Sequence, residues 1–226
     1  MLDGKSGGER GVELAAAQAV NEAAEAAALD GDGDAGVGGL KAAQDLALAR
    51  ADHLAGQKSE RQMAAHVMLL VAQREPELLS EFIPDLIDAL YRPEAQTRWE
   101  ILDALTLLVL EHAKEIGAAF DGAEAALFDD LSSILHFSAF RLLATWGATE
   151  RGRSRKVWPI LDEAIQCYHG DVEFNDMLNA VAEFATGKLS EHVKEALVER
   201  MSFDAHNGRG ALKRKAQTII DNVQGQ

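Results

Sequence analysis

The sequence predicts an all-α protein built from stacked helix pairs. Ala and Leu dominate its apolar residues, aromatic residues make up only 6% of the chain, and proline occurs four times. Ala and Leu are strong helix formers, whereas β-rich cores draw on branched and aromatic residues. From Leu40 onward, apolar residues also recur at helical spacing. This periodicity predicts amphipathic helices over most of the chain.

Residues 1–39 differ in composition from the rest of the chain. Their segment 12–29 is rich in Ala but has almost no large apolar side chains, and the Gly- and Asp-rich sequence GDGDAGVGG follows it. A lone Ala-rich helix has little surface to bury and is marginal in water. We therefore expect residues 1–39 to be loosely attached or mobile, and residues 40–226 to form one helical repeat domain.

The clearest helix pair lies between residues 76 and 112. Large apolar residues between 78 and 91 fall in pairs four positions apart, which builds one wide apolar stripe. Pro93 then breaks the run, because proline excludes the preceding residue from helical geometry. The next stretch, 95–112, is apolar nearly all round, so we expect a helix that is packed on several sides.

The same two-helix unit recurs along the chain. The predicted pairs are 40–56 with 58–73, 77–91 with 95–112, 124–135 with 137–147, 157–169 with 171–186, and 190–201 with 210–223. Their repeat of about 37 residues lies between the periods of two known helical-repeat types. The pattern predicts a short right-handed α-solenoid of about five helix pairs.

One unit carries a likeness to a known family. FIPDLIDAL at 82–90, followed after a short break by TRWEILDAL at 97–105, resembles a HEAT repeat of the HEAT/armadillo class. Arg98 stands near the start of the second helix, and Arg61 occupies the matching place one repeat earlier. The resemblance implies that each arginine pairs with an acidic residue of its own or the next repeat. The later units carry no clear arginine at this place.

The resemblance implies a binding function, because α-solenoids present long surfaces to other molecules. We expect a non-catalytic protein–protein interaction or scaffold module whose second helices line a groove. Two alternatives stay open: a HEAT-like DNA repair glycosylase or another enzyme that acts on nucleic acid, and a structural subunit of a larger complex. The glycosylase alternative would draw on tryptophan and aspartate, for which the chain offers Trp99, Trp146 and Trp158 with Asp103 and Asp162.

Charge narrows the choice of partner. The formal net charge of −15 repels phosphate backbones and anionic lipid, so it disfavours nucleic acid and membrane as partners. Two basic clusters interrupt this acidic chain. We expect the first to be a loop, either merely solvated or docking an acidic segment of a protein partner, and the second to start the last helix. The first contains Arg151, Arg153, Arg155 and Lys156, and the second Arg209, Lys213, Arg214 and Lys215.

No motif in the chain predicts catalysis or a cofactor. The acidic run that starts at Asp30 has Ala35 and Lys41 where a calcium loop needs glycine and a bidentate glutamate. No Ser-His-Asp or Cys-His arrangement is recognisable. We therefore expect no catalytic residue, no cofactor and no metal site.

The single cysteine, Cys167, cannot form an internal disulfide and is expected to be a small buried residue of an amphipathic helix. No apolar run approaches the roughly 18 residues of a membrane span, and the first residues lack the apolar core of a signal peptide. Together with the single cysteine, these features predict a cytoplasmic protein.

Overall fold

The computed structural model describes residues 57–130 and 132–225. Over these two ranges the chain forms helices and connecting turns, without a strand, so the predicted all-α class is confirmed there. The predictions for residues 1–39 and for the helix at 40–56 lie outside the described residues.

Four complete helix pairs follow one leading helix in the described part of the chain. The elements are α3 (Lys58–Arg74), the 3-10 helix η2 (Pro76–Phe82), α4 (Ile83–Ala89), α5 (Ala95–Ile116), the 3-10 helix η3 (Gly117–Ala119), α6 (Phe120–Leu127), α7 (Ser133–Gly147), α8 (Arg151–Cys167), α9 (Phe174–Phe184), α10 (Glu191–Asn207) and α11 (Gly210–Gln224). The second helices start at Lys58, Ala95, Ser133, Phe174 and Gly210, which are 37, 38, 41 and 36 residues apart. The predicted period therefore persists through the array.

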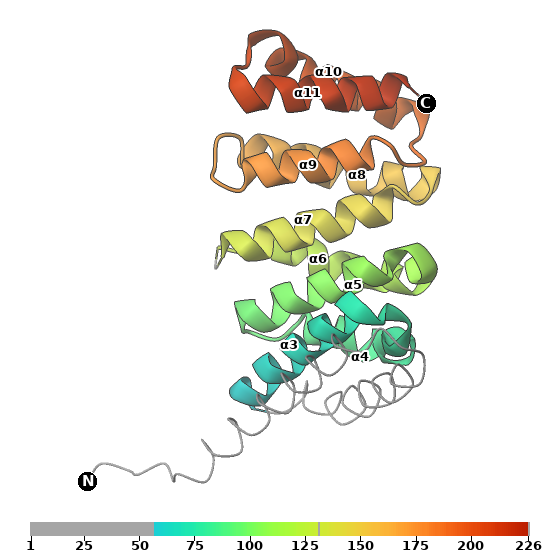
Figure 1. The fold of residues 1–226 in the computed structure, drawn as a ribbon, viewed down its shortest axis with the longest axis vertical. Helices are drawn as coiled ribbons and strands as arrows, with labels where there is room; N and C mark the ends of the chain where they lie inside the picture. The colour runs from blue at the N-terminus through green and yellow to red at the C-terminus, as the bar shows by residue number, and fades with distance from the viewer. Residues whose placement is uncertain (1–56, 131, 226) are drawn as a thin grey trace, which may run out of the picture.

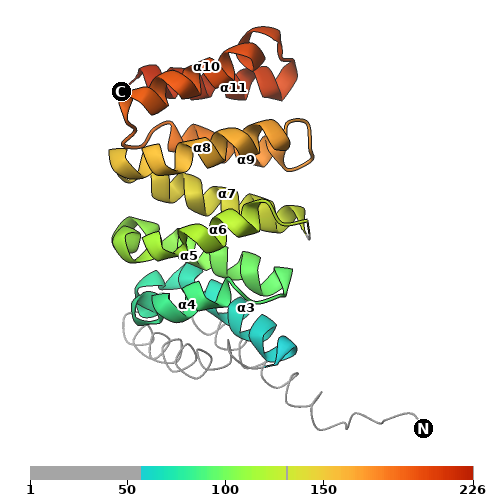
Figure 2. The same ribbon diagram turned by 180° about the vertical axis from the view of Figure 1, so that it is seen from behind.

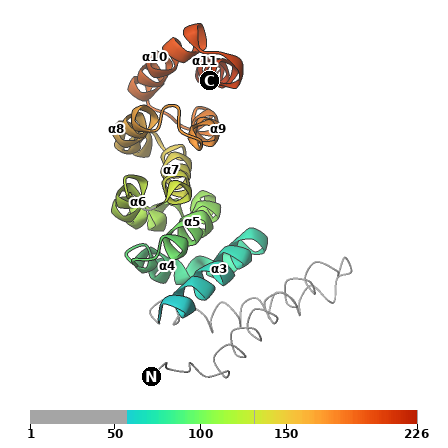
Figure 3. The same ribbon diagram turned by 90° about the vertical axis from the view of Figure 1, so that its left-hand side faces the viewer.

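The helices stack in two parallel rows. Helices α3, α5, α7, α9 and α11 form the row that faces the viewer in Figure 1, and α4, α6, α8 and α10 form the row behind it, which is in front in Figure 2. Seen from the side in Figure 3, the stack curves, with the first row on its concave side. We call these two rows the inner row and the outer row.

The core is a continuous layer between the two rows. Leu79, Phe82 and Leu86 from the first unit pack into the same cluster as Ile101 and Leu105 of α5. Further along, the same layer holds the fully buried aromatic rings of α7 and α9, Phe140 and Phe184. Each unit thus buries its apolar stripe against its own partner and its neighbours, as a stacked repeat must.

Several predicted helix boundaries differ from those of the structure. The expected single helix at 77–91 is split into η2 and α4, because Pro84 cannot donate the backbone hydrogen bond that would continue the helix through it. The expected helix at 124–135 ends at Leu127. Helix α7 begins at Ser133, four residues earlier than predicted, after Ser132 adopts an extended backbone conformation with φ −165° and ψ 126°.

The basic segment 151–156 is helical, so its prediction as a loop is wrong. It forms the first turns of α8, which follows the extended residue Glu150. The buried position in the first turn is Ser154, which is fully buried and accepts a hydrogen bond from the Ser190 backbone N–H at 3.0 Å. Because that position holds a serine rather than an apolar residue, the helical apolar stripe becomes visible in the sequence only at Val157 and Trp158.

Candidate functional site

The concave face is formed by one stripe from each inner-row helix. Residues three or four apart share a helix face, and the side opposite each helix's buried stripe points away from the core. These stripes contain Gln62, His66 and Gln73 of α3, Gln96, Trp99, Asp103, Leu107 and Leu110 of α5, Ile134, Phe137, Arg141 and Thr145 of α7, Asn175, Asn179 and Glu183 of α9, and Arg214 and Thr218 of α11.

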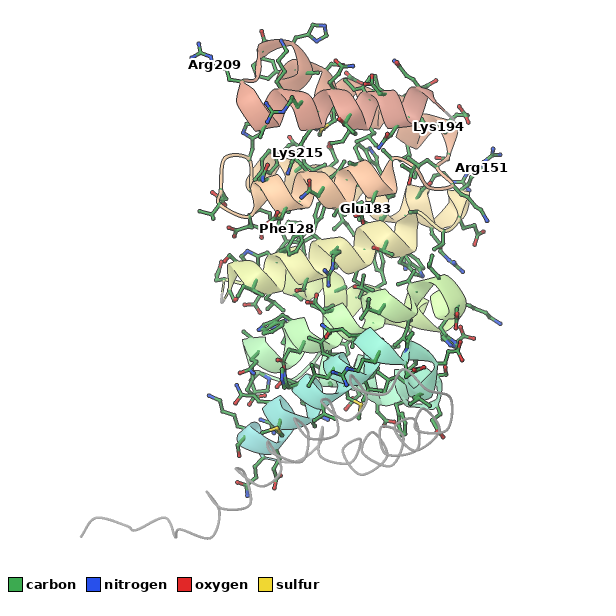
Figure 4. The ribbon with its side chains drawn as sticks, viewed as in Figure 1. Phe128, Arg151, Glu183, Lys194, Arg209 and Lys215 are labelled. Carbon is green, nitrogen blue, oxygen red and sulfur yellow. The ribbon has the colours of Figure 1, made fainter. Side chains whose placement is uncertain are left out.

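Contacts between neighbouring helices support this assignment. Gln62 donates to Gln96 at 3.2 Å between α3 and α5, and Arg141 reaches Asp103 at 2.8 Å between α5 and α7. Between α9 and α11, Lys215 donates to the Asn175 carbonyl at 2.6 Å. Figure 4 shows Lys215 between these two helices. Polar side chains on this face therefore bridge neighbouring inner-row helices, and at Asp103 and Arg141 the bridge joins equivalent positions of α5 and α7.

Apolar side chains are exposed on the concave face of α5 and α7. Leu110 is 85% exposed, Ile134 55% and Leu107 44%, while Trp99 and Phe137 are half-buried. As expected, the second helix of this unit is packed on several sides, against α3, α4 and α7, but Leu107 and Leu110 lie on its remaining side and are exposed. Both lie on the same side of α5 as Asp103, one and two turns further along, where no helix of the described chain covers them. Isolated exposed apolar residues are common, but a group of them on one concave face is a candidate binding surface.

Asp103 and Arg141 form an ion pair at the centre of this apolar group. The Arg141 guanidinium also lies 5.8 Å from the centre of the Phe137 ring. Burial raises the pKa of Asp103, although Arg141 and Ser138 act in the opposite direction. The Asp103 carboxylate thus already has two partners within the protein, the Arg141 guanidinium and the Ser138 hydroxyl.

Two further carboxylates face α3 and are also paired. Glu100 is almost fully buried and lies 3.0 Å from Nδ1 of His66. Burial raises the pKa of Glu100, partly offset by this histidine. Glu94 forms a bidentate contact with Arg61, and this hydrogen bonding lowers the pKa of Glu94.

The two arginines singled out by the family resemblance both reach carboxylates in the next unit. Arg61 contacts Glu94, 33 residues later, and Arg98 Nη1 lies 2.6 Å from Asp129 Oδ2, 31 residues later. Arg98 is 8% exposed. Arg200 makes a similar contact with Asp162 between α10 and α8 at 2.9 Å. The sequence did not point to this third pair, because Arg200 lies in the middle of α10, the first helix of its unit, and not near the start of a second helix.

The first basic cluster lies at the start of α8, in the outer row. Arg153 donates to Thr149 at 2.8 Å and lies 5.5 Å from the Trp146 ring, and the Lys156 ammonium lies 3.7 Å from the Phe120 ring. Arg151 and Arg155 are exposed, and Figure 4 shows Arg151 at the lateral edge of the stack, near Lys194. Two of the four cations therefore pack on aromatic rings. Binding of an acidic partner at this cluster stays a prediction.

Two of the three tryptophans that the glycosylase alternative would draw on are buried, and both of its aspartates are paired. Trp146 is buried and donates to the Ala113 carbonyl at 2.7 Å, and Trp158 is buried with its ring parallel to that of Phe184. Asp162 and Asp103 are both paired with arginine. Of the three tryptophans, only Trp99 lies on the concave face.

Other chemical features of the described residues are few. Residues 57–130 and 132–225 hold no group of three potential metal ligands among His, Cys, Asp and Glu. Cys167, expected to be buried, is exposed in the last turn of α8, beyond the apolar stripe that ends at Ile165. Over the same residues, no helix combines the length and apolar character that crossing a bilayer requires.

Comparison with known proteins supports the fold and leaves the function open. No family model matches the chain, and no curated protein does. A designed armadillo repeat protein in complex with the peptide (KR)4 matches with a TM-score of 0.70 at 14% identity, over 97% of this chain and 95% of that chain. Computationally designed armadillo repeat proteins for modular peptide recognition match with a TM-score of 0.68 at 14% identity, over 96% and 95% of the two chains. An engineered protein matches with a TM-score of 0.63 at 16% identity, over 91% and 96%. The predicted armadillo-like solenoid is thereby confirmed.

Proposed function

We propose that this protein binds an extended segment of a protein partner on its concave face and performs no catalysis itself. The observation that carries the proposal is the group of exposed apolar side chains on α5 and α7, Leu107, Leu110 and Ile134. Within residues 57–130 and 132–225, they lie on the side of α5 and α7 that faces away from the buried core. An extended segment laid across parallel helices could bury several of these side chains at once.

The fold comparison adds indirect support. Two of the matching designs are described as binding or recognising peptides, one of them with (KR)4 bound. Their likeness to this chain is one of fold alone, because identity is 14%. A solenoid of this shape offers a long continuous surface, which suits a polypeptide better than a compact small molecule.

Leu110→Ser should weaken binding of peptide ligands by about tenfold or more. Burial of a leucine contributes about 1.5–3 kcal/mol, and 1.4 kcal/mol corresponds to a factor of ten in Kd. Ligands would be selected from a random peptide library on the immobilised full chain. Their affinities for wild-type and variant chains would then be measured by fluorescence anisotropy.

Phe203→Ser provides the matched control, since Phe203 is 71% exposed but lies on α10 in the outer row. The Phe203→Ser variant should bind the selected peptides within about twofold of the wild-type affinity, because a residue outside the contact surface contributes little to the binding free energy. Ligands that bind Leu110→Ser as tightly as wild type, or a selection that yields no ligand above background, would contradict the proposal. Circular dichroism of both variants checks that the helices are intact.

A further inference from the structure

The charges along the concave face are distributed unevenly between its two ends. The carboxylates that face α3 and α7 at this end already have partners within the fold: Glu94 and Asp103 pair with the guanidinium groups of Arg61 and Arg141, and Glu100 contacts the His66 imidazole. A lysine or arginine of a ligand would gain little there, because it would have to compete with a cation held by the fold itself. This end therefore offers a ligand mainly its apolar side chains.

Cations without a carboxylate partner lie at the opposite end. They belong to the second basic cluster: Arg209, the residue before α11, and Lys213, Arg214 and Lys215 in its first two turns. Over residues 57–130 and 132–225, none of these four side chains forms an ion pair. Lys213 and Lys215 donate to the backbone carbonyls of His206 and Asn175. Arg209 and Arg214 are exposed, and α11 contains a single carboxylate, Asp221.

Helical spacing places one of these cations on the concave face. Arg214, Thr218 and Asn222 are four residues apart, so they form one stripe of α11. Asn222, at the end of this stripe, donates to the Ala182 carbonyl of α9 at 2.9 Å. Arg214 thus lies beside the α9–α11 contact, at the same end of α11 as Lys215, which Figure 4 shows.

We propose that the concave face is selective for a segment with apolar residues over α5 and α7 and acidic residues over the first turns of α11. This inference rests on the proposed function and names its ligand class. Charge complementarity at α11 carries it, together with the paired state of the carboxylates at the other end. The same argument disfavours a purely basic peptide such as (KR)4.

The geometry also sets the spacing within such a ligand. Two interhelical steps separate α7 from α11, and at 8–10 Å per step they span about 20 Å, which an extended chain covers in about six residues. Helix α9, between them, presents the amides of Asn175 and Asn179, together with the exposed carboxylates of Asp176 and Glu183. The acidic residues of the ligand should therefore lie beyond α9, over Arg214 and Lys215.

Three labelled peptides of about 12 residues, long enough to cross from α5 to α11, test this selectivity. The first carries Leu and Phe at one end and Asp and Glu at the other, about six residues apart. The second replaces its acids with Lys and Arg, and the third replaces its apolar residues with Ser. Anisotropy with the full chain should show the first binding about tenfold more tightly than either other, with a smaller advantage at about 300 mM salt than at 50 mM.

Arg214→Glu should reverse the preference, so that the apolar–basic peptide binds more tightly than the apolar–acidic one. The double variant Arg151→Glu/Arg155→Glu makes a larger charge change at the outer-row cluster and should leave the preference in place. Equal binding of the acidic and basic peptides to wild type would overturn the selectivity. Loss of the preference in the Arg151/Arg155 variant but not in Arg214→Glu would also overturn it.

Failure of the selectivity can be told apart from failure of the proposed function through Leu110→Ser. If that variant loses the apolar peptides while wild type does not distinguish acid from base, the concave face binds peptides without the proposed selectivity. If Leu110→Ser retains every peptide at wild-type affinity, the concave face is not the binding site, and both proposals are wrong.

Discussion

Arg98→Ala should lower the free energy of unfolding by about 3 kcal/mol, the scale expected when one partner of a buried ion pair is removed. Arg98 is 8% exposed, and its guanidinium lies 2.6 Å from the carboxylate of Asp129, which belongs to the segment that leads into α7. Without the guanidinium, this half-buried carboxylate loses its contact with Arg98 in a region of low dielectric. Urea denaturation followed by circular dichroism would measure the loss.

Arg92→Ala is the matched control for this change. Arg92 also contacts an aspartate at 2.6 Å, but its partner Asp88 is four residues away in the same unit and 68% exposed. Exposed pairs of this kind contribute about 0.5 kcal/mol or less, so the control should stay close to wild type. Equal losses in the two variants would show that the pair between units is no stronger than a surface pair.

The contribution of the pair itself can be isolated with a double-mutant cycle. If Arg98 and Asp129 stabilise the fold through each other, the double variant Arg98→Ala/Asp129→Ala should lose at least about 1 kcal/mol less than the sum of the single losses. Strict additivity would mean that each residue acts through other neighbours.

The sequence alone predicts the architecture because that architecture depends on local signals. Proline and glycine between apolar stripes delimit the helices, and the position of Arg61 relative to Arg98 reveals the period of the repeat. The same signals fail where a polar residue fills a buried position. Ser154 is the example, since its burial depends on the Ser190 backbone in the next unit, which no local pattern reveals.

The candidate site was harder to predict than the fold, and Leu110 shows why. A leucine within an apolar stretch normally lies in the core, but this one lies on the side of α5 that faces away from the outer row and is 85% exposed. Exposure of that kind is a property of how neighbouring units are placed. The spacing of residues within one helix reveals which of them share a face, but it does not reveal whether another helix covers that face.

Close contact between units also explains a glycine outside the helices, and Gly187→Ala should lower the free energy of unfolding by about 2–3 kcal/mol. Gly187 lies between α9 and α10, where the chain passes the end of α7. A Cβ atom at this position would lie 2.5 Å from the Ala148 Cβ, 2.6 Å from the Ala148 carbonyl oxygen and 2.7 Å from its Cα. The next residue, Lys188, donates its backbone N–H to that same oxygen at 2.7 Å, so the two segments cannot separate without losing a hydrogen bond.

Gly152→Ala should not lower the free energy of unfolding and serves as the control. The nearest atom to a Cβ at Gly152 is Glu150 Oε1, at 3.5 Å, which is an ordinary contact. Alanine is favoured over glycine within a helix by up to about 1 kcal/mol, so this variant of α8 should be as stable as wild type or more stable. Urea midpoints would compare the two variants, and a Gly187→Ala midpoint equal to wild type would contradict the close-contact argument.

A second-site change then separates a side-chain clash from a backbone clash. Ala148→Gly removes one of the three close atoms near residue 187 but leaves the carbonyl oxygen and Cα in place. If the backbone approach limits the position, adding Ala148→Gly to Gly187→Ala should recover less than half of the lost stability. Full recovery would mean that the two segments pack through their side chains alone. Partial recovery would show that glycine at 187 sets how closely the unit formed by α10 and α11 can follow the end of α7.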